Sequence, residues 1–194
     1  MNVFILCSGR SGSTTFIRAC QHIDNFSAGH ETRPALLGEE RLDFPDNHIE
    51  ADNRLSWMLG KLGKKYGKDA FYVHLRRDVE PTAVSFNRRW DYPGSLIRAY
   101  TKGILMAGEQ RGLKYCRDML ETIHYNIEYF LRDKPNQMTI HLETISQDFP
   151  RFWQWIGAEG DLDAAMHQWE IRYNQSKKLG IFGRMAGRIK GQKQ

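Results

Sequence analysis

The sequence predicts a single α/β domain in which a central parallel sheet is flanked by helices on both faces. Short apolar segments alternate along the chain with longer amphipathic ones, which is the pattern of a parallel sheet in a three-layer fold. The length of 194 residues, with 41% hydrophobic and 26% charged residues, is typical of one globular domain. We assign residues 1–175 to this domain and residues 176–194 to a basic C-terminal tail.

The first predicted strand covers residues 3–7 and is entirely apolar. A predicted helix over residues 13–22 follows, and the same contrast between short apolar runs and helical spacing identifies the later elements. The other predicted strands are a segment that ends near 29–34, then 49–53, 70–75 and 138–142. The other predicted helices are 54–66, 80–90, 95–107, 113–131, 149–156 and 162–173.

The connection between the first strand and the first helix reads Gly9-Arg10-Ser11-Gly12. Ser13, Thr14 and Thr15 then open the helix, whose first N–H groups converge on one point and whose macrodipole adds positive potential there. A structural turn capped by hydroxyl groups is the alternative interpretation. Arg10 favours anion binding, because a purely structural turn has little use for a cation. The sequence therefore predicts a P-loop-like phosphate site.

Four polar residues fall at the carboxyl ends of predicted strands, the edge where parallel sheets bind ligands: Arg10, Glu31, Asn53 and Arg77. Ser85 lies eight residues after Arg77 on the next predicted helix. The guanidinium fork of an arginine and a serine hydroxyl in this arrangement can hold one phosphate from two sides. We therefore expect a second phosphate contact beside the turn.

Together these stretches resemble the sulfotransferases that use 3′-phosphoadenosine 5′-phosphosulfate (PAPS) and release 3′-phosphoadenosine 5′-phosphate (PAP). In that family a turn of the type Arg/Lys-Ser-Gly-Thr/Ser-Thr holds the 5′-phosphosulfate, and Arg10–Thr14 matches it. An Arg at a strand end and a Ser eight residues later hold the 3′-phosphate, as Arg77 and Ser85 would. The resemblance implies a metal-free cofactor site made of Arg10, Ser11, Gly12, Ser13, Thr14, Thr15, Arg77, Ser85 and Arg89.

A third segment, Gly29-His30-Glu31-Thr32-Arg33, is similar to Gly-Glu-Glu-Thr-Arg of the tyrosylprotein and bacterial branch. In that branch the second Glu is the catalytic base, which implies Glu31 here, and a further cofactor arginine follows the Ser by four residues, as Arg89 does. The resemblance thus implies that Glu31 and Arg10 are catalytic. Arg54 could stabilise the transferred group or be a surface residue at a helix start.

Two features depart from the cytosolic small-molecule branch of this family. That branch uses a histidine base on the strand before the 3′-phosphate arginine, and this chain has no clear equivalent. His48 and Asp52 lie near that place and remain competitors of Glu31 for the role of base. The Gly-rich basic loop that closes over PAPS in that branch is only loosely matched by residues 177–184.

Composition limits the partners and the location. The net charge is +5, and the sequence has seven histidines without metal-ligand spacing and three cysteines without a disulfide or zinc pattern. We expect reduced thiols, a cytoplasmic location, no leader segment and no membrane span. The tail is basic but poor in aromatic residues, so nucleic acid is an unfavoured partner.

Two alternatives remain beside a sulfotransferase. A nucleoside or nucleotide kinase would need Gly-Lys-Ser/Thr at the end of the turn, whereas Gly12 is followed by Ser13 and Thr14. A non-catalytic module that binds adenine nucleotides or nucleic acid would not need Glu31. We expect residues 34–45 and 90–112 to line the acceptor pocket. The acceptor is a hydroxyl compound, which the sequence leaves open among sugar, peptide, phenol and lipid, and the oligomeric state also stays open.

Overall fold

The computed structural model describes residues 1–171, which form one α/β domain built on a five-stranded sheet. The predicted tail 176–194, the loop 177–184 and the predicted domain end at 175 lie outside the described residues. All the neighbouring strands pair in parallel, in the order β2-β3-β1-β4-β5. The predicted fold class is confirmed. The strands are β1 (Asn2–Leu6), β2 (Ser27–His30), β3 (His48–Ala51), β4 (Phe71–Arg76) and β5 (Gln137–His141).

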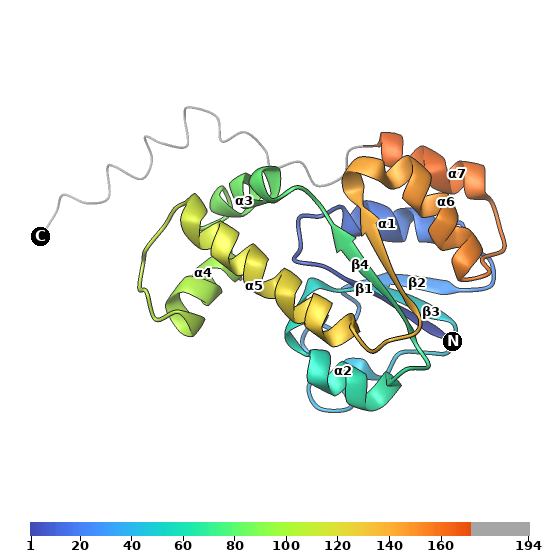
Figure 1. Ribbon diagram of the computed structural model, residues 1–194, viewed down its shortest axis with the longest axis horizontal. Coiled ribbons are helices and arrows are strands. Elements are labelled where there is room, and N and C mark those ends of the chain that lie inside the picture. The colour runs from blue at the N-terminus through green and yellow to red at the C-terminus, as the bar shows by residue number, and fades with distance from the viewer. Residues whose placement is uncertain (172–194) are drawn as a thin grey trace, which may run out of the picture.

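The helices form a layer on each face of the sheet (Figure 1). One layer contains α1 (Ser13–Cys20), α6 (Ile145–Trp155) and α7 (Leu162–His167). The other contains α2 (Leu59–Tyr66), α3 (Val79–Asn87), α4 (Leu96–Ala99) and α5 (Leu113–Leu131).

Alternate residues of β1 enter two separate cores, because successive side chains of a strand point to opposite faces. Val3 and Ile5 pack in the core beneath α1 and α6, whereas Phe4 and Leu6 pack in the core beneath α2 and α5. All of β1 is buried. This explains why its residues after Asn2 form a continuous apolar run, as expected for the central strand of a parallel sheet.

The connections that follow β1 and β3 cover opposite faces of the sheet, and this arrangement positions the site. α1 covers one face as the chain moves from β1 to β2, whereas α2 covers the other as the chain crosses from β3 to β4. The carboxyl end of β1 therefore lies at a topological switch point, where sheets of this type bind their ligands.

Several predicted helices differ from the structure in detail. The helix predicted over 162–173 is α7 followed by a 3₁₀ turn, Gln168–Glu170, and its last two residues lie outside the described residues. The helix predicted over 54–66 is a 3₁₀ segment, η2 (Asn53–Trp57), followed by α2, because the Ser56 hydroxyl bonds both the N–H and the carbonyl of Cys7 and ties this segment to the end of β1. The helix predicted over 95–107 is α4 followed by a wider turn, Tyr100–Ile104. α6 begins four residues earlier than predicted, because Asp148 accepts hydrogen bonds from the Thr144 hydroxyl and the His141 N–H.

Candidate functional site

The turn between β1 and α1 combines left-handed backbone with the start of a helix. Gly9, Arg10 and Gly12 all have positive φ angles, of 84°, 61° and 91°. Alternation of left-handed and right-handed residues turns successive N–H groups toward one side, where they can bind an anion. Gly12 is the N-cap of α1 and provides no side-chain cap, which leaves the first N–H groups of the helix available to an anion.

Arg10 and the two residues predicted to hold a 3′-phosphate lie together. Arg10 Nε donates to Ser85 Oγ at 2.9 Å, and Arg77 Nη1 donates to the carbonyl of Arg10 at 3.1 Å. The sequence separations are 75 and 67 residues. The folded chain thus brings the two predicted phosphate contacts to one place.

Positive charge is concentrated at this end of the site. Burial and the like charges of Arg89 and Arg77 lower the pKa of Arg10 below its ordinary value. Arg89 Nε is buried and has no hydrogen-bond partner among residues 1–171, and its guanidinium lies 5.1 Å from the ring centre of Tyr92. A cluster of three guanidinium groups is unfavourable by itself and is relieved by a bound polyanion.

The remaining predicted cofactor residues lie along the same turn and helix start. Ser11 is fully buried, with its hydroxyl beside the thiol of Cys7. Ser13, Thr14 and Thr15 occupy the first turn of α1, as predicted.

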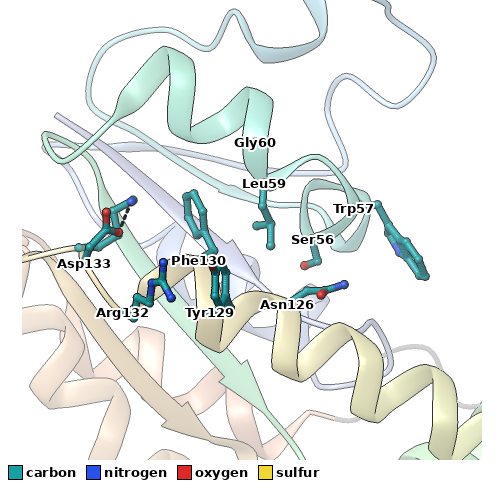
Figure 2. Close-up of a pocket in the computed structure, with 10 residues that line it drawn as sticks. Ser56, Trp57, Leu59, Gly60, Asn126, Tyr129, Phe130, Arg132 and Asp133 are labelled. Atoms are coloured by element: carbon teal, nitrogen blue, oxygen red, sulfur yellow. Dashed lines mark hydrogen bonds and ion pairs between the residues drawn. The ribbon is translucent and has the colours of Figure 1, made fainter.

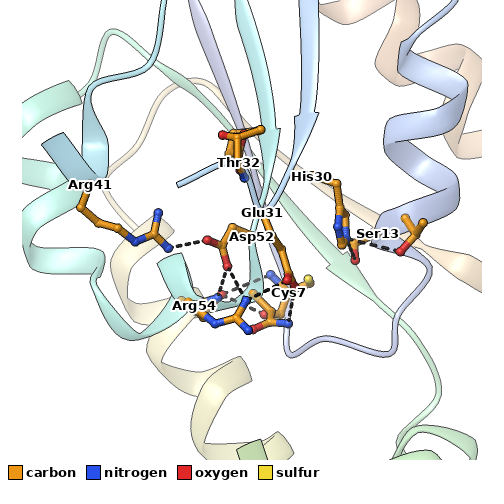
Figure 3. Close-up of polar contacts among 12 residues, drawn as sticks. Cys7, Ser13, His30, Glu31, Thr32, Arg41, Asp52 and Arg54 are labelled. Atoms are coloured by element: carbon orange, nitrogen blue, oxygen red, sulfur yellow. Dashed lines mark hydrogen bonds and ion pairs between the residues drawn. The ribbon is translucent and has the colours of Figure 1, made fainter. Parts of the chain in front are cut away.

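Glu31 follows β2 directly and lies beside the end of β3 (Figure 3). Its Oε1 accepts a hydrogen bond from Asn53 Nδ2 at 3.2 Å, and its Oε2 lies 2.9 Å from Arg54 Nη1. Burial lowers the pKa of Arg54, but the carboxylates of Glu31 and Asp52 outweigh this and raise it above its ordinary value. The Glu31 side chain is 29% exposed, so the carboxylate is oriented and still open to solvent.

Both competitors of Glu31 have structural partners. His48 Nε2 lies 3.0 Å from Glu50 Oε2, and its Nδ1 lies 2.8 Å from Ser27 Oγ. His48 is the first residue of β3, so it lies at the opposite end of the strands from the turn. Asp52 is fully buried, pairs with Arg41 and accepts a bond from the N–H of Arg54 at 2.8 Å (Figure 3). These contacts favour Glu31 as the available carboxylate.

The structure adds His30 to the site, although the sequence analysis did not select it. His30 Nε2 lies 3.1 Å from Ser13 Oγ and 3.4 Å from Thr14 Oγ1 (Figure 3). His30 is the last residue of β2, and Glu31 follows it. The signal that could have found it is alternation: two adjacent residues at a strand end point to opposite sides, one toward α1 and one toward η2.

Two glycines allow the parts of the site to approach one another. A Cβ atom at Gly9 would lie 2.9 Å from Asn53 Nδ2, the atom that also bonds Glu31. A Cβ atom at Gly12 would lie 2.9 Å from Leu142 Cδ1. With their positive φ angles, these positions favour glycine, and a larger residue would also displace the side chain of Asn53 or Leu142.

A separate cavity of about 480 Å³ lies between η2, α2 and the C-terminal part of α5 (Figure 2). Trp57, Tyr129 and Phe130 contribute aromatic rings to it, and none of the predicted site residues lines it.

Within residues 1–171, no group of three His, Cys, Asp or Glu side chains is placed to hold a metal ion. No helix in this range combines the length and apolar character that a membrane crossing requires.

No protein-family model matches the sequence, and no curated protein matches it. Among solved structures, the chain is similar to the mouse sulfotransferase SULT7A1, crystallised as a complex with PAP, with a TM-score of 0.55 and 13% sequence identity. The match covers 87% of this chain and 63% of the mouse protein. The protein therefore has the sulfotransferase fold.

Proposed function

We propose that this protein is a PAPS-dependent sulfotransferase that transfers a sulfuryl group to a hydroxyl acceptor. The observation that carries the proposal is the gathering of Arg10, Arg77, Ser85 and Arg89 beside the N-terminal turn of α1. The shared fold with a sulfotransferase crystallised with PAP supports it.

The donors in this cluster fit PAPS, which carries anionic groups at both its 5′ and 3′ positions. The turn from Arg10 to Gly12 and the hydroxyls of Ser13, Thr14 and Thr15 would hold the 5′-phosphosulfate. Ser85 and the forks of Arg77 and Arg89 would hold the 3′-phosphate, because guanidinium groups bind phosphate through paired hydrogen bonds. Ser11 would belong to the same 5′ site, with its side chain fully buried.

PAPS, when bound, supplies an activated sulfuryl group for in-line transfer and leaves as PAP. Glu31 would accept the proton of the acceptor hydroxyl as a general base, with Asn53 and Arg54 orienting its carboxylate. Arg10 would stabilise the negative charge that grows on the leaving phosphate, since its guanidinium stays protonated. This assignment of the base follows the tyrosylprotein and bacterial branch.

The acceptor would approach between the segments 34–45 and 90–112, as the sequence predicts. Leu37, Ile104 and Met106 are exposed there, with 84%, 58% and 85% of their surface accessible. An acceptor with an apolar portion would cover them.

A cytoplasmic location remains a prediction, based on the expectation of reduced thiols. Cys7, Cys20 and Cys116 are free and buried.

Isothermal calorimetry with PAP, ATP and adenosine 5′-phosphate in the presence of EDTA tests the cofactor assignment. We expect PAP to bind most tightly without divalent metal. Metal-dependent binding, or a preference for ATP, would contradict the proposal and support a kinase. Transfer from labelled PAPS to a panel of sugars, peptides, phenols and lipids then identifies the acceptor.

A further inference from the structure

The conformation of Glu31 needs an explanation, because its φ angle is 52°. Non-glycine residues rarely adopt left-handed φ angles, and those that do are held by their surroundings. The N–H of Glu31 donates to the carbonyl of Ala51 at 3.0 Å, which continues the ladder between β2 and β3. The contacts that hold the chain immediately after Glu31 are made by Thr32.

Thr32 is attached to a buried carboxylate by two hydrogen bonds. Its N–H donates to Glu50 Oε1 at 2.9 Å, and its hydroxyl donates to Glu50 Oε2 at 2.8 Å. Glu50 lies in β3 and is fully buried. Glu31 is therefore fixed on both sides, by Ala51 before it and by Glu50 after it.

His48 and Ser27 complete this arrangement, which we call the Glu50 network: Ser27, Thr32, His48 and Glu50. Glu50 Oε2 accepts a further hydrogen bond from His48 Nε2 at 3.0 Å, and His48 Nδ1 lies 2.8 Å from the Ser27 hydroxyl. The ring of Phe44 stacks on His48 at 5.6 Å. Each oxygen of the buried carboxylate thus has a donor, as burial of a charge requires.

Gly29 shows how closely the network is packed. A Cβ atom there would lie 2.3 Å from Thr32 Cγ2 and 2.9 Å from Glu50 Oε2. The side chains of Thr32 and Glu50 therefore close directly over the backbone of β2. A buried ionic group adds little net stability compared with a well-packed apolar residue, but it can specify one conformation. The conformation specified here is that of the loop carrying Glu31.

We propose that Glu50 is a positioning residue for Glu31: through its two bonds to Thr32 it holds the Glu31 backbone in the left-handed conformation that directs the carboxylate toward Asn53 and Arg54. This inference rests on the proposed role of Glu31 as the general base. Glu50 is too deeply buried to touch the substrate, so it acts through the loop. Misplacement of a base by about 1 Å can cost on the order of 100-fold in rate.

The test is a double-mutant cycle measured with PAPS and any acceptor that the wild-type protein uses. Glu50→Ala should lower kcat by about 100-fold and leave PAP affinity unchanged. Glu50→Gln should retain most of the activity, because its amide oxygen can still accept from the Thr32 N–H. Thr32→Val, which loses only the hydroxyl bond, should cause a smaller loss. In the Glu31→Gln background, Glu50→Ala should have little further effect, because the group that it positions is already gone.

Two controls separate positioning from general destabilisation and from failure of the proposed function. His124→Gln disrupts another buried polar pair, with His74 on β4, two strands away, and should leave kcat unchanged. Hydrogen exchange at the amides of residues 31–33 should accelerate in Glu50→Ala. If the wild-type protein transfers no sulfuryl group, the proposed function fails, and the exchange measurement still decides whether Glu50 holds the loop. Full kcat in Glu50→Ala, or equal losses in both backgrounds of the cycle, would overturn the inference.

Discussion

At the ends of β1 and β4, the guanidinium groups of Arg77 and Arg89 are close enough to lower the pKa of Arg10. At the ends of β2 and β3, the Glu31 carboxylate instead lies between Asn53 and Arg54. The first region gathers like charges, which become favourable only when an anion is bound. The second region holds opposite charges together and is stable without a ligand. The contrast supports the proposal that one half of the site would bind the charged donor and the other half would orient a base.

The largest expected effect separates the two halves. Glu31→Gln keeps the shape of the side chain but removes the base, so kcat should fall by about 10²–10⁴-fold. PAP affinity should change little, since Glu31 does not belong to the anion-binding half. His48→Ala and Asp52→Asn, assayed beside it, test the competitors. If Glu31→Gln retained more than about a tenth of the activity while one of these was inactive, the assignment of the base would be wrong.

Arg10→Ala should affect both quantities, because in the proposed mechanism Arg10 holds the cofactor and also stabilises the leaving phosphate. Loss of a charge-assisted contact of about 1.5–3 kcal/mol corresponds to a PAP affinity about 10–100-fold weaker, and turnover should fall as well. Calorimetry and steady-state kinetics measure the two effects. Arg132→Ala, at the C-terminal end of α5, is a matched control that removes an arginine far from the turn. A variant that lost only turnover would show that Arg10 does not bind the cofactor.

A smaller effect concerns the stability of the fold away from the site, where His74 of β4 bonds His124 of α5 at 2.8 Å. Burial, with nearby positive charge, lowers the pKa of His74 to about 3 and that of His124 to about 4. In the unfolded chain both histidines take up protons as the pH falls below about 6.5, whereas the folded protein does not until about pH 4. The free energy of unfolding should therefore decrease as the pH falls from about 6.5 to about 4, by roughly 1–3 kcal/mol per pH unit for the pair together.

Urea unfolding at several pH values measures this dependence. His124→Gln should weaken this dependence, because one of the two histidines is gone, whereas His74 stays buried and should keep its own contribution. Identical pH dependence in the variant and the wild-type protein would contradict the assignment to this pair.

The gathering of Arg10, Arg77 and Ser85 at one turn could be predicted because its signals are local, whereas their role in binding an anion stays a prediction. Arg10, Gly12 and Ser13 are contiguous, and a turn between an apolar strand and a helix can be recognised without knowledge of the rest of the fold. The pairing of Arg77 and Ser85 with this turn followed from their places at a strand end and on the next helix.

The base half was only partly predictable, because it depends on contacts between strands. No role was assigned to Glu50 from the sequence, because its burial and its bonds to Thr32 follow from the register of β2 and β3. His30 was missed for the same reason, since only the packing of α1 beside β2 brings it to Ser13. The break between η2 and α2 depends on the tertiary bond from Ser56 to Cys7, which no local pattern shows.

The most direct test of the whole account is the ratio of the affinities for PAP and adenosine 5′-phosphate, measured by calorimetry with EDTA for the wild-type protein and Arg77→Ala. The ratio isolates the 3′-phosphate, because any disturbance of the turn through the Arg77–Arg10 bond affects both ligands equally. We predict that the wild-type preference for PAP falls about 10–100-fold in Arg77→Ala and by less in Ser85→Ala. An unchanged ratio, with both ligands weakened equally, would contradict the assignment of this cluster to a 3′-phosphoadenosine cofactor.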